Sequence, residues 1–367
     1  MFLGLRGIGG VQGGVETHVQ ELVRNLPYPL ERLEVIGRRP YRAMADADSS
    51  LPIVRWLPAW RHSLLETLPH TLLGICYAAF RRPALLHIHG IGPSIAARLA
   101  RLAGLRVVST HHGEDYNREK WGKFAQRILR FGEMEAVLQT DACISVSPTV
   151  AQALQDRYNR PVDFIPNGVN PLPYTSTAMT LEQWDLKPNR YILNVARMVP
   201  EKRQLDLISA FVQADLRGIK LVLCGGADHD SSYAQSVVEK ASQHENIILT
   251  SHQTGNTLHE LFWNAGLFVL PSTHEGLPIV LLEAMSCNLR IVVSDLPVYT
   301  AMNIPVDCMF PRGDVPALAD HLRKAFASNF SLGHNWNVFL DDYKWTNIAR
   351  RTASIYELLV PSFDKVC

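Results

Sequence analysis

The chain has 367 residues, of which 47% are hydrophobic and 19% charged, and its formal net charge is +1. This composition is typical of a well-packed globular protein and excludes a strongly basic nucleic-acid binder or a disordered tail. No segment reaches the roughly 18 apolar residues that a membrane-spanning helix needs, and the first residues read as a strand rather than as a cleavable signal peptide. Six scattered cysteines without a Cys-x-x-Cys pair favour free thiols in a reducing cytoplasm.

Short apolar strands alternate with helices, which is the pattern of a parallel, doubly wound sheet. Strands are predicted at 2–5, 33–36, 85–89, 107–110, 142–146 and 162–165, with helices such as 17–26 and 93–103. After a Pro, Gly and Asn-rich break at 166–173, further strands are predicted at 191–195, 220–224, 246–250, 267–270 and 291–294. The sequence predicts an α/β fold of two Rossmann-like doubly wound domains, 1–170 and 171–345, facing across a cleft, and a helix at 346–367.

A glycine-rich loop, residues 6–16, follows the first strand and opens the first helix. Glycine permits positive φ angles and close approach of the backbone to a ligand. The glycines fit the dinucleotide fingerprint poorly, and no acidic residue closes the second strand, where Gly37, Arg38 and Arg39 stand instead. The loop therefore does not favour a nicotinamide enzyme.

Two histidines, His111 and His112, follow the fourth predicted strand of the first half. A histidine at a strand end can donate a hydrogen bond to a sugar hydroxyl or to developing charge, or it can simply pack. Aromatic and aliphatic residues then recur at helical spacing, next to basic residues one position earlier: Trp121, Phe124, Ile128 and Phe131; Lys120, Lys123, Arg127 and Arg130. This double stripe is compatible with contact to an anionic membrane or with a core-packed helix that has a solvated basic edge.

In the second half, Arg197 and Lys202 come just after the strand 191–195. Two cations on one strand-end loop could neutralise a diphosphate leaving group. The guanidinium of Arg would form a bidentate contact, and the ammonium of Lys would act as a point charge.

Glu275 and Glu283 flank a strand-to-helix crossover after the strand 267–270, with Glu283 about two turns into the helix. The backbone amides of Gly276, Leu277 and Ile279 lie between them, at the positive end of a helix. Carboxylates suit sugar and ribose hydroxyls and amides suit phosphate, so this segment favours a nucleotide sugar. The alternative is an ordinary helix with two surface glutamates.

Together, and in this order, these motifs resemble the retaining glycosyltransferases of the GT-B fold, family 4 (the group 1 glycosyltransferases), over nearly the whole chain. The resemblance implies that Glu283 binds the ribose, Glu275 the transferred sugar, and Arg197 and Lys202 the departing diphosphate. It assigns Gly13, Gly14, Gly276 and Leu277 to the donor and His112 to the catalytic site, and it leaves the role of His111 open. It implies no cofactor and no metal ion, and it predicts that the last helix packs back on the first domain.

Residues 113–124 are similar to a segment of transferases that build bacterial O-antigen, capsule or related glycans. By this resemblance Asp115, Arg118 and Lys120 are candidate acceptor-binding residues. We expect a lipid-linked oligosaccharide acceptor at the inner face of the membrane, with a soluble acceptor as the alternative, and a donor based on UDP, GDP or dTDP.

Two other functions remain open. One is a different GT-B enzyme, such as a sugar-nucleotide epimerase or an α-glucan synthase or phosphorylase. The other is a non-catalytic donor-binding subunit of a glycan assembly complex. The sequence lacks an Asp-x-Asp motif, a His/Cys cluster with metal spacing, a P-loop and a Gly-x-Ser-x-Gly elbow.

Overall fold

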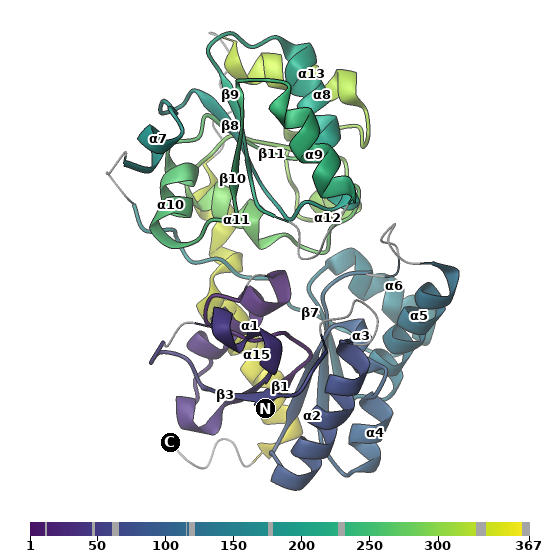
Figure 1. The fold of residues 1–367 in the computed structure, drawn as a ribbon. Helices are drawn as coiled ribbons and strands as arrows, with labels where there is room; N and C mark the ends of the chain where they lie inside the picture. The colour runs from purple at the N-terminus through teal and green to yellow at the C-terminus, as the bar shows by residue number, and fades with distance from the viewer. Residues whose placement is uncertain are drawn as a thin grey trace. The chain divides into compact units, whose positions relative to one another are not determined.

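The computed structural model describes residues 1–11, 13–45, 48–60, 66–114, 116, 122–174, 179–226, 232–327 and 335–361. The chain divides into two compact units (Figure 1). Unit 1 holds residues 1–168 and 343–367, and unit 2 holds residues 169–342, so the chain passes twice between the units.

Unit 1 is built on a seven-stranded parallel sheet in the order β3-β2-β1-β4-β5-β6-β7. The strands are β1 (Phe2–Leu3), β2 (Glu34–Arg38), β3 (Ile53–Leu57), β4 (Leu86–His89), β5 (Val107–His111), β6 (Ala142–Ser145) and β7 (Asp163–Phe164). The strand order reverses between β1 and β4. Ligands of doubly wound sheets bind at such a switch point, beyond the carboxyl ends of the strands.

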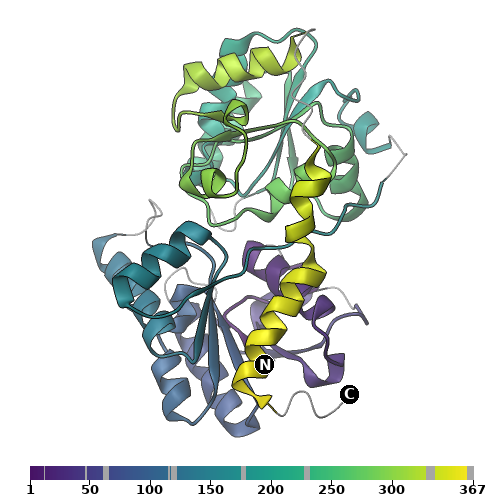
Figure 2. The same ribbon diagram turned by 180° about the vertical axis from the view of Figure 1, so that it is seen from behind.

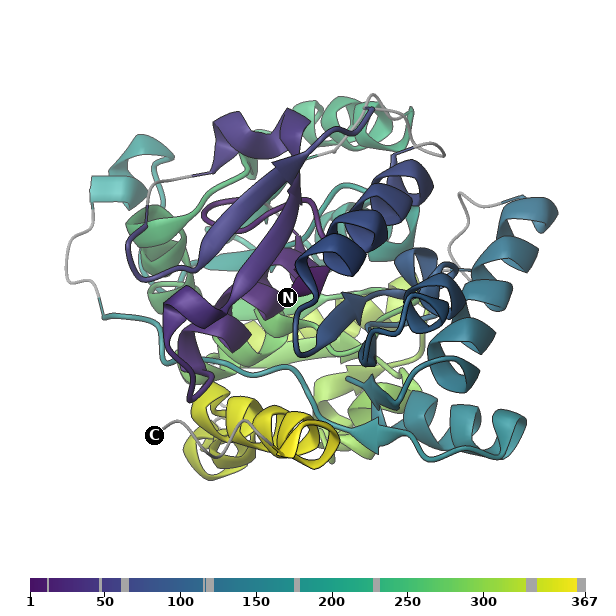
Figure 3. The same ribbon diagram turned by 90° about the horizontal axis from the view of Figure 1, so that it is seen from below.

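Helices cover both faces of this sheet. They are α1 (Gly14–Asn25), α2 (Thr67–Arg81), α3 (Ile91–Ser94), α4 (Ala97–Leu102), α5 (Lys123–Leu138), α6 (Pro148–Tyr158) and α15 (Trp345–Leu359). Side chains alternate along β4: Leu86 and Ile88 enter a core shared with α2 and α4, whereas His87 and His89 face α1 and α15. Figure 3 shows α2 (dark blue) and α15 (yellow) on opposite sides of the strands of unit 1.

Unit 2 contains a six-stranded parallel sheet in the order β10-β9-β8-β11-β12-β13, which reverses between β8 and β11. The strands are β8 (Tyr191–Val195), β9 (Lys220–Cys224), β10 (Ile247–Ser251), β11 (Leu267–Leu270), β12 (Ile291–Ser294) and β13 (Met309–Phe310). The helices are α7 (Met179–Gln183), α8 (Gln204–Ala214), α9 (Ser232–Ser242), α10 (Gly255–Trp263), α11 (Ile279–Ser286), α12 (Pro297–Ala301), α13 (Val315–Phe326) and α14 (Trp336–Leu340). The predicted fold class of two parallel, Rossmann-like α/β domains is confirmed.

The last helix, α15, belongs to unit 1 although it follows unit 2 in the sequence. It lies beside α1, and Figure 2 shows it in yellow against unit 1. Trp345 is 1% exposed and packs on the backbone of Gly168, where a Cβ would lie 2.6 Å from the indole. No helix among the described residues has the length and apolar character needed to span a bilayer.

Some elements differ from the sequence prediction. The segment 93–103 forms two short helices, α3 and α4, instead of one. Two strands, β3 and β13, were not predicted. The strand β3 is an edge strand whose side chains are half-buried or exposed, so it lacks the apolar run that marks the central strands.

Candidate active site

Two loops of unit 2 bring a lysine and a glutamate together at the switch point of the sheet. Lys202 ends a 3-10 turn after β8 (Pro200–Lys202), and Glu275 lies in the loop between β11 and α11. The Lys202 Nζ lies 2.5 Å from Glu275 Oε1, and the two side chains are 16% and 7% exposed. An ion pair shielded to this degree is less screened by salt than a surface pair.

Serines hold Glu275 in this position. The Ser272 hydroxyl donates a hydrogen bond to the same Glu275 Oε1 at 2.6 Å, and the hydroxyl of Ser294 donates to the carbonyl of Ser272. The two loops are also joined directly, because the Thr273 amide donates to the Glu201 carbonyl at 2.8 Å. No motif of the sequence marks these serines as functional. Their positions, next to β11 and at the end of β12, follow from the strand order.

Arg197 lies on the same strand-end loop as Lys202 and is half-buried. The loop follows a fixed path: the side chain of Gln204 donates to the Arg197 carbonyl at 2.9 Å, and the Met198 amide donates to the Gly226 carbonyl at 2.9 Å. Gly225 has a φ of 145°, and a Cβ there would lie 1.9 Å from the Ala196 carbonyl oxygen. The close approach of these two loops therefore requires glycine at this position.

The other donor candidates of unit 2 lie on the crossover into α11 and on α11 itself. Gly276 and Leu277 precede Pro278, the N-cap of α11, which offers no side-chain hydrogen bond to the helix. A helix start that no side chain caps is suited to an anion. Glu283 is half-buried and is the fifth residue of α11. It therefore lies little more than one turn into the helix, and the prediction of two turns was wrong because the helix begins only at Ile279.

One further residue of unit 2 was not foreseen. The side chain of Tyr299 is 0% exposed, and its hydroxyl has no hydrogen-bond partner among the described residues. Burial raises the pKa of Tyr299, and the charge of Glu275 adds to the shift. The coupling to Glu275 places this unsatisfied hydroxyl in the environment of the ion pair.

In unit 1, Gly13 is the N-cap of α1 with a φ of 148°. A Cβ at Gly13 would lie 1.9 Å from the Glu16 carboxylate, which accepts a hydrogen bond from the Arg6 amide at 3.0 Å. Glu16 therefore holds the glycine-rich loop in place, because its carboxylate lies against Gly13 and binds the Arg6 amide. A Cβ at Gly14 would meet no described atom within 4 Å, so Gly14 faces open space.

The structure separates the roles of the two adjacent histidines. Both ring nitrogens of His111 are used: Nδ1 accepts from the Gly113 amide at 3.2 Å and Nε2 lies 3.3 Å from Glu133 Oε2. Burial alone would raise the pKa of Glu133, but hydrogen bonds from His111 and other neighbours hold this pKa below its usual value. His111 is thus committed to holding the loop.

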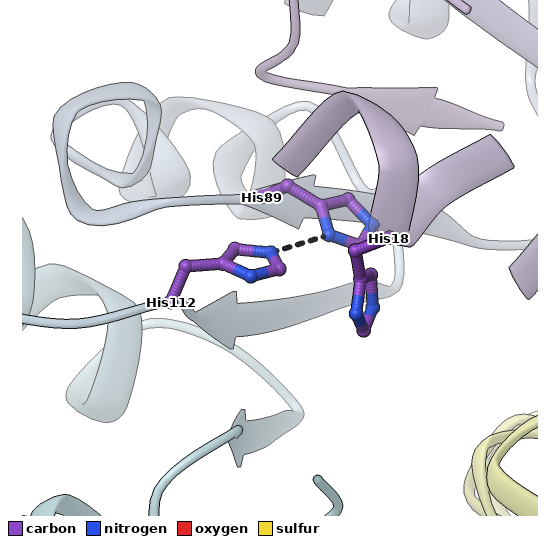
Figure 4. Close-up of side chains that lie close together, drawn as sticks. All are labelled: His18, His89 and His112. Atoms are coloured by element: carbon purple, nitrogen blue, oxygen red, sulfur yellow. Dashed lines mark hydrogen bonds between the residues drawn. The ribbon is translucent and has the colours of Figure 1, made fainter. Parts of the chain in front are cut away.

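His112 instead turns to the opposite side and meets two other histidines (Figure 4). Its Nε2 lies 3.0 Å from His89 Nδ1, and its ring centroid lies 4.8 Å from that of His18. The pKa of His112 falls well below its usual value, mainly through burial and then through the neighbouring His18, His87 and His111. His18, His89 and His112 are the one group of metal-binding residue types among the described residues that could hold a metal ion.

The acceptor candidates Asp115, Arg118 and Lys120 lie outside the described residues, as does Trp121. The described part of the double stripe lies on α5. Phe124, Ile128 and Phe131 are 77%, 39% and 46% exposed, and Lys123, Arg127 and Arg130 are also exposed. The core-packed interpretation is therefore wrong for these three side chains, because α5 packs on the sheet through its other face.

Comparison with known proteins gives two family matches. The model "Glycosyltransferase Family 4" matches residues 12–171 and "Glycosyl transferases group 1" matches residues 181–337. Alpha-maltose-1-phosphate synthase of Mycobacterium tuberculosis is 27% identical over 94% of this chain and 95% of its own. O-antigen chain mannosyltransferase RfbU of Salmonella typhimurium is 27% identical over 48% of each chain. The crystal structure of Anabaena HepE in complex with UDP and glucose superposes with a TM-score of 0.76 at 16% identity, over 97% of this chain and 100% of its own.

Proposed function

The chain belongs to the group 1 glycosyltransferases and has the GT-B fold, and from this premise we propose that it transfers a sugar from a nucleotide-sugar donor to a glycan acceptor with retention of the anomeric configuration. The observation that carries the proposal is the shielded pair of Lys202 and Glu275 at the switch point of unit 2. Glycosyl transfer to an acceptor requires that a departing diphosphate be neutralised and that the sugar be held by its hydroxyls.

The roles proposed for the other site residues follow from this ion pair. The donor phosphates compete with Glu275 for Lys202, so that Lys202 and Arg197 neutralise the leaving group and Glu275 becomes available to the sugar hydroxyls. The amides at Gly276 and Leu277 assist at the phosphates, together with the loop of Gly13 and Gly14. Glu283, on the first turns of α11, binds the ribose. These cations and amides would replace a metal ion at the diphosphate.

His112 is the proposed catalytic residue of unit 1. Its low pKa keeps the ring neutral at physiological pH, and a neutral imidazole can donate one hydrogen bond to a sugar hydroxyl. Retention would proceed by attack on the face from which the nucleotide leaves, with Glu275 as the first candidate if a covalent intermediate forms.

We further propose that the acceptor is a lipid-linked oligosaccharide of bacterial surface polysaccharide synthesis, approached at the inner face of the membrane. The exposed stripe of α5 supports this, and so does a second surface on the same sheet face. Between residues 67 and 113 the sequence contains five exposed arginines and no Asp or Glu. The helices of this segment expose large apolar side chains: Leu68, Leu72, Leu73 and Phe80 of α2; Leu99 and Leu102 of α4. Apolar groups flanked by arginines suit an anionic bilayer.

The test begins with the donor. Thermal unfolding of the full-length protein is measured with UDP, GDP and dTDP, without added metal, for the wild type and Glu283→Ala. A ligand that binds the native state raises the unfolding temperature by mass action. We expect a shift with one nucleotide that the variant loses. No shift with any nucleotide, or an equal shift in the variant, would contradict the assignment of this pocket.

The second step tests transfer. The donor that binds is incubated with lipid-linked and soluble glycan acceptors, and the anomeric configuration of the product is read by NMR. A product of inverted configuration would overturn the retaining mechanism. Conversion of the donor in the absence of any acceptor would identify an epimerase or hydrolase instead.

A further inference from the structure

A cluster of three imidazoles, two buried and one half-buried, lies at the switch point of unit 1. His18 comes from α1, His89 is the last residue of β4, and His112 follows β5 (Figure 4). Each ring offers one nitrogen, and the three nitrogens lie within 4.8 Å of one another. No carboxylate or thiolate belongs to this group.

The hydrogen bonds around the cluster leave a lone pair on His18. Its Nδ1 lies 2.7 Å from Asn167 Oδ1, and because a carbonyl oxygen only accepts, the proton must be on Nδ1. A neutral imidazole with its proton on Nδ1 carries a lone pair on Nε2, which is the atom left to bind a metal ion. This is the arrangement of a metal-binding histidine, whose second nitrogen donates to a carbonyl that fixes the ring.

His89 is incompletely satisfied. Its side chain is 0% exposed, and Nε2 has no hydrogen-bond partner among the described residues. Its Nδ1 lies 3.0 Å from His112 Nε2. The two rings form an N–H···N hydrogen bond when one of these nitrogens carries a proton. When both carry a lone pair they repel each other, and a metal ion between them would bind both.

We propose that His18, His89 and His112 bind a zinc ion. Zinc binds imidazole nitrogens at about 2.0–2.1 Å in a tetrahedral arrangement, which places neighbouring ligand atoms roughly 3.3 Å apart. The observed separations of 3.0 to 4.8 Å require rotamer shifts on the order of an ångström. Three imidazoles without a carboxylate select zinc and related transition metals over magnesium.

His87 supplies the internal contrast. Its ring centroid lies 4.1 Å from that of His89, yet both of its nitrogens have hydrogen-bond partners: the Thr110 hydroxyl lies 2.7 Å from Nε2 and the Tyr356 hydroxyl 2.5 Å from Nδ1. It is therefore no ligand. A zinc ion on His112 Nε2 leaves the proton on Nδ1, so the ring can still donate a hydrogen bond and the proposed role of His112 is retained.

The proposal is tested on untagged, full-length protein by metal content. The protein is stripped with a chelator, loaded with Zn²⁺ or Co²⁺ and dialysed, and the bound metal is measured by plasma mass spectrometry. We expect about one ion per chain. For Co²⁺ we also expect the intense visible bands of a tetrahedral site. Mg²⁺ should not compete.

Variants then locate the ion. His18→Gln and His89→Gln should abolish it, His87→Gln should keep it, and Asn167→Leu should weaken zinc binding about 10–100-fold. Circular dichroism verifies that each variant is folded. The Co²⁺ spectrum of the wild-type protein tests the proposal even if a variant fails to fold. Folded wild-type protein that retains no Zn²⁺ and shows no Co²⁺ bands would overturn the proposal, and so would retention of the ion by His18→Gln.

Discussion

At the scale of single residues, the pair of Lys202 and Glu275 makes a direct prediction for catalysis. Lys202→Ala and Glu275→Ala should each reduce kcat/KM about 10²–10³-fold, the usual effect of removing one group that stabilises transition-state charge. The matched control is Asp185→Ala. This change removes the ion pair between Asp185 and Lys220, in which the Asp185 side chain is 87% exposed. This control should keep normal activity. Near-normal turnover in both site variants, with unfolding temperatures equal to the wild type, would contradict the site.

A second residue-scale prediction concerns pH. Burial, followed by the charge of Arg38, lowers the pKa of His70 to about 4, and its Nε2 donates to the Gly37 carbonyl at 3.2 Å. The unfolded ring titrates near 6.5, so the stabilisation by neutral His70 is present above pH 6.5 and is lost as the pH falls towards 4.

Urea unfolding at pH 7.5 and 5.0 measures this loss. The wild type should lose about 2 kcal/mol more than His70→Gln between these two values, because 1.5 pKa units correspond to this free energy. Gln can donate to the same carbonyl and carries no titrating group, so contributions from Glu66 and from the other buried histidines cancel. Equal losses in the two proteins would show that His70 does not titrate in this range.

At the scale of the elements, α5 predicts membrane binding. The full-length protein should sediment with phosphatidylglycerol vesicles and much less with phosphatidylcholine, and salt should weaken the binding. Replacing Phe124 and Phe131 with Ser should weaken it at least about tenfold, since burial of each ring contributes on the order of 2 kcal/mol. Val306→Ser is the control, because Val306 is an apolar residue of unit 2 that is 80% exposed, close to the 77% of Phe124. Undiminished sedimentation of the double variant would exclude α5 as the contact.

The elements also show how far the sequence determines the fold. The strands 191–195, 220–224, 267–270 and 291–294 were predicted to the residue, because central parallel strands are apolar on both faces and are bounded by polar residues. The edge strand β3 has no such run. The periodicity of α5 was visible, but periodicity does not say whether an apolar stripe meets the core or solvent, and here it meets solvent.

The candidate site follows the same logic. Lys202 and Glu275 were found separately from local motifs, and only the neighbouring positions of β8 and β11 explain why they meet. His18 and His89 were missed because neither belongs to a motif. Their meeting with His112 depends on the order β1-β4-β5 and on how α1 packs against it, which is long-range information that spacing in the sequence does not contain.

At the scale of the whole molecule, the chain crosses between units after Gly168 and after Asp342, and two tryptophans lie on either side of the second crossing. Trp336 is 3% exposed in unit 2, where its indole N–H donates to the Leu289 carbonyl at 2.9 Å. Trp345, nine positions later, is 1% exposed in unit 1, with its ring centroid 5.4 Å from that of His18. The two residues are alike in type and burial but belong to different cores.

Replacing each with Ala should therefore destabilise different units, in each case by about 3–5 kcal/mol. Hydrogen exchange read by mass spectrometry locates the effect. Trp345→Ala should accelerate exchange in α1 and β4, whereas Trp336→Ala should accelerate it in α11, against which α14 packs. Trp345 follows unit 2 directly in sequence. If Trp345→Ala accelerates exchange in α11 and leaves exchange in α1 unchanged, α15 is not part of unit 1. If it accelerates exchange in α1 and leaves exchange in α11 unchanged, the stability of unit 1 depends on a helix that is synthesised only after unit 2 is complete.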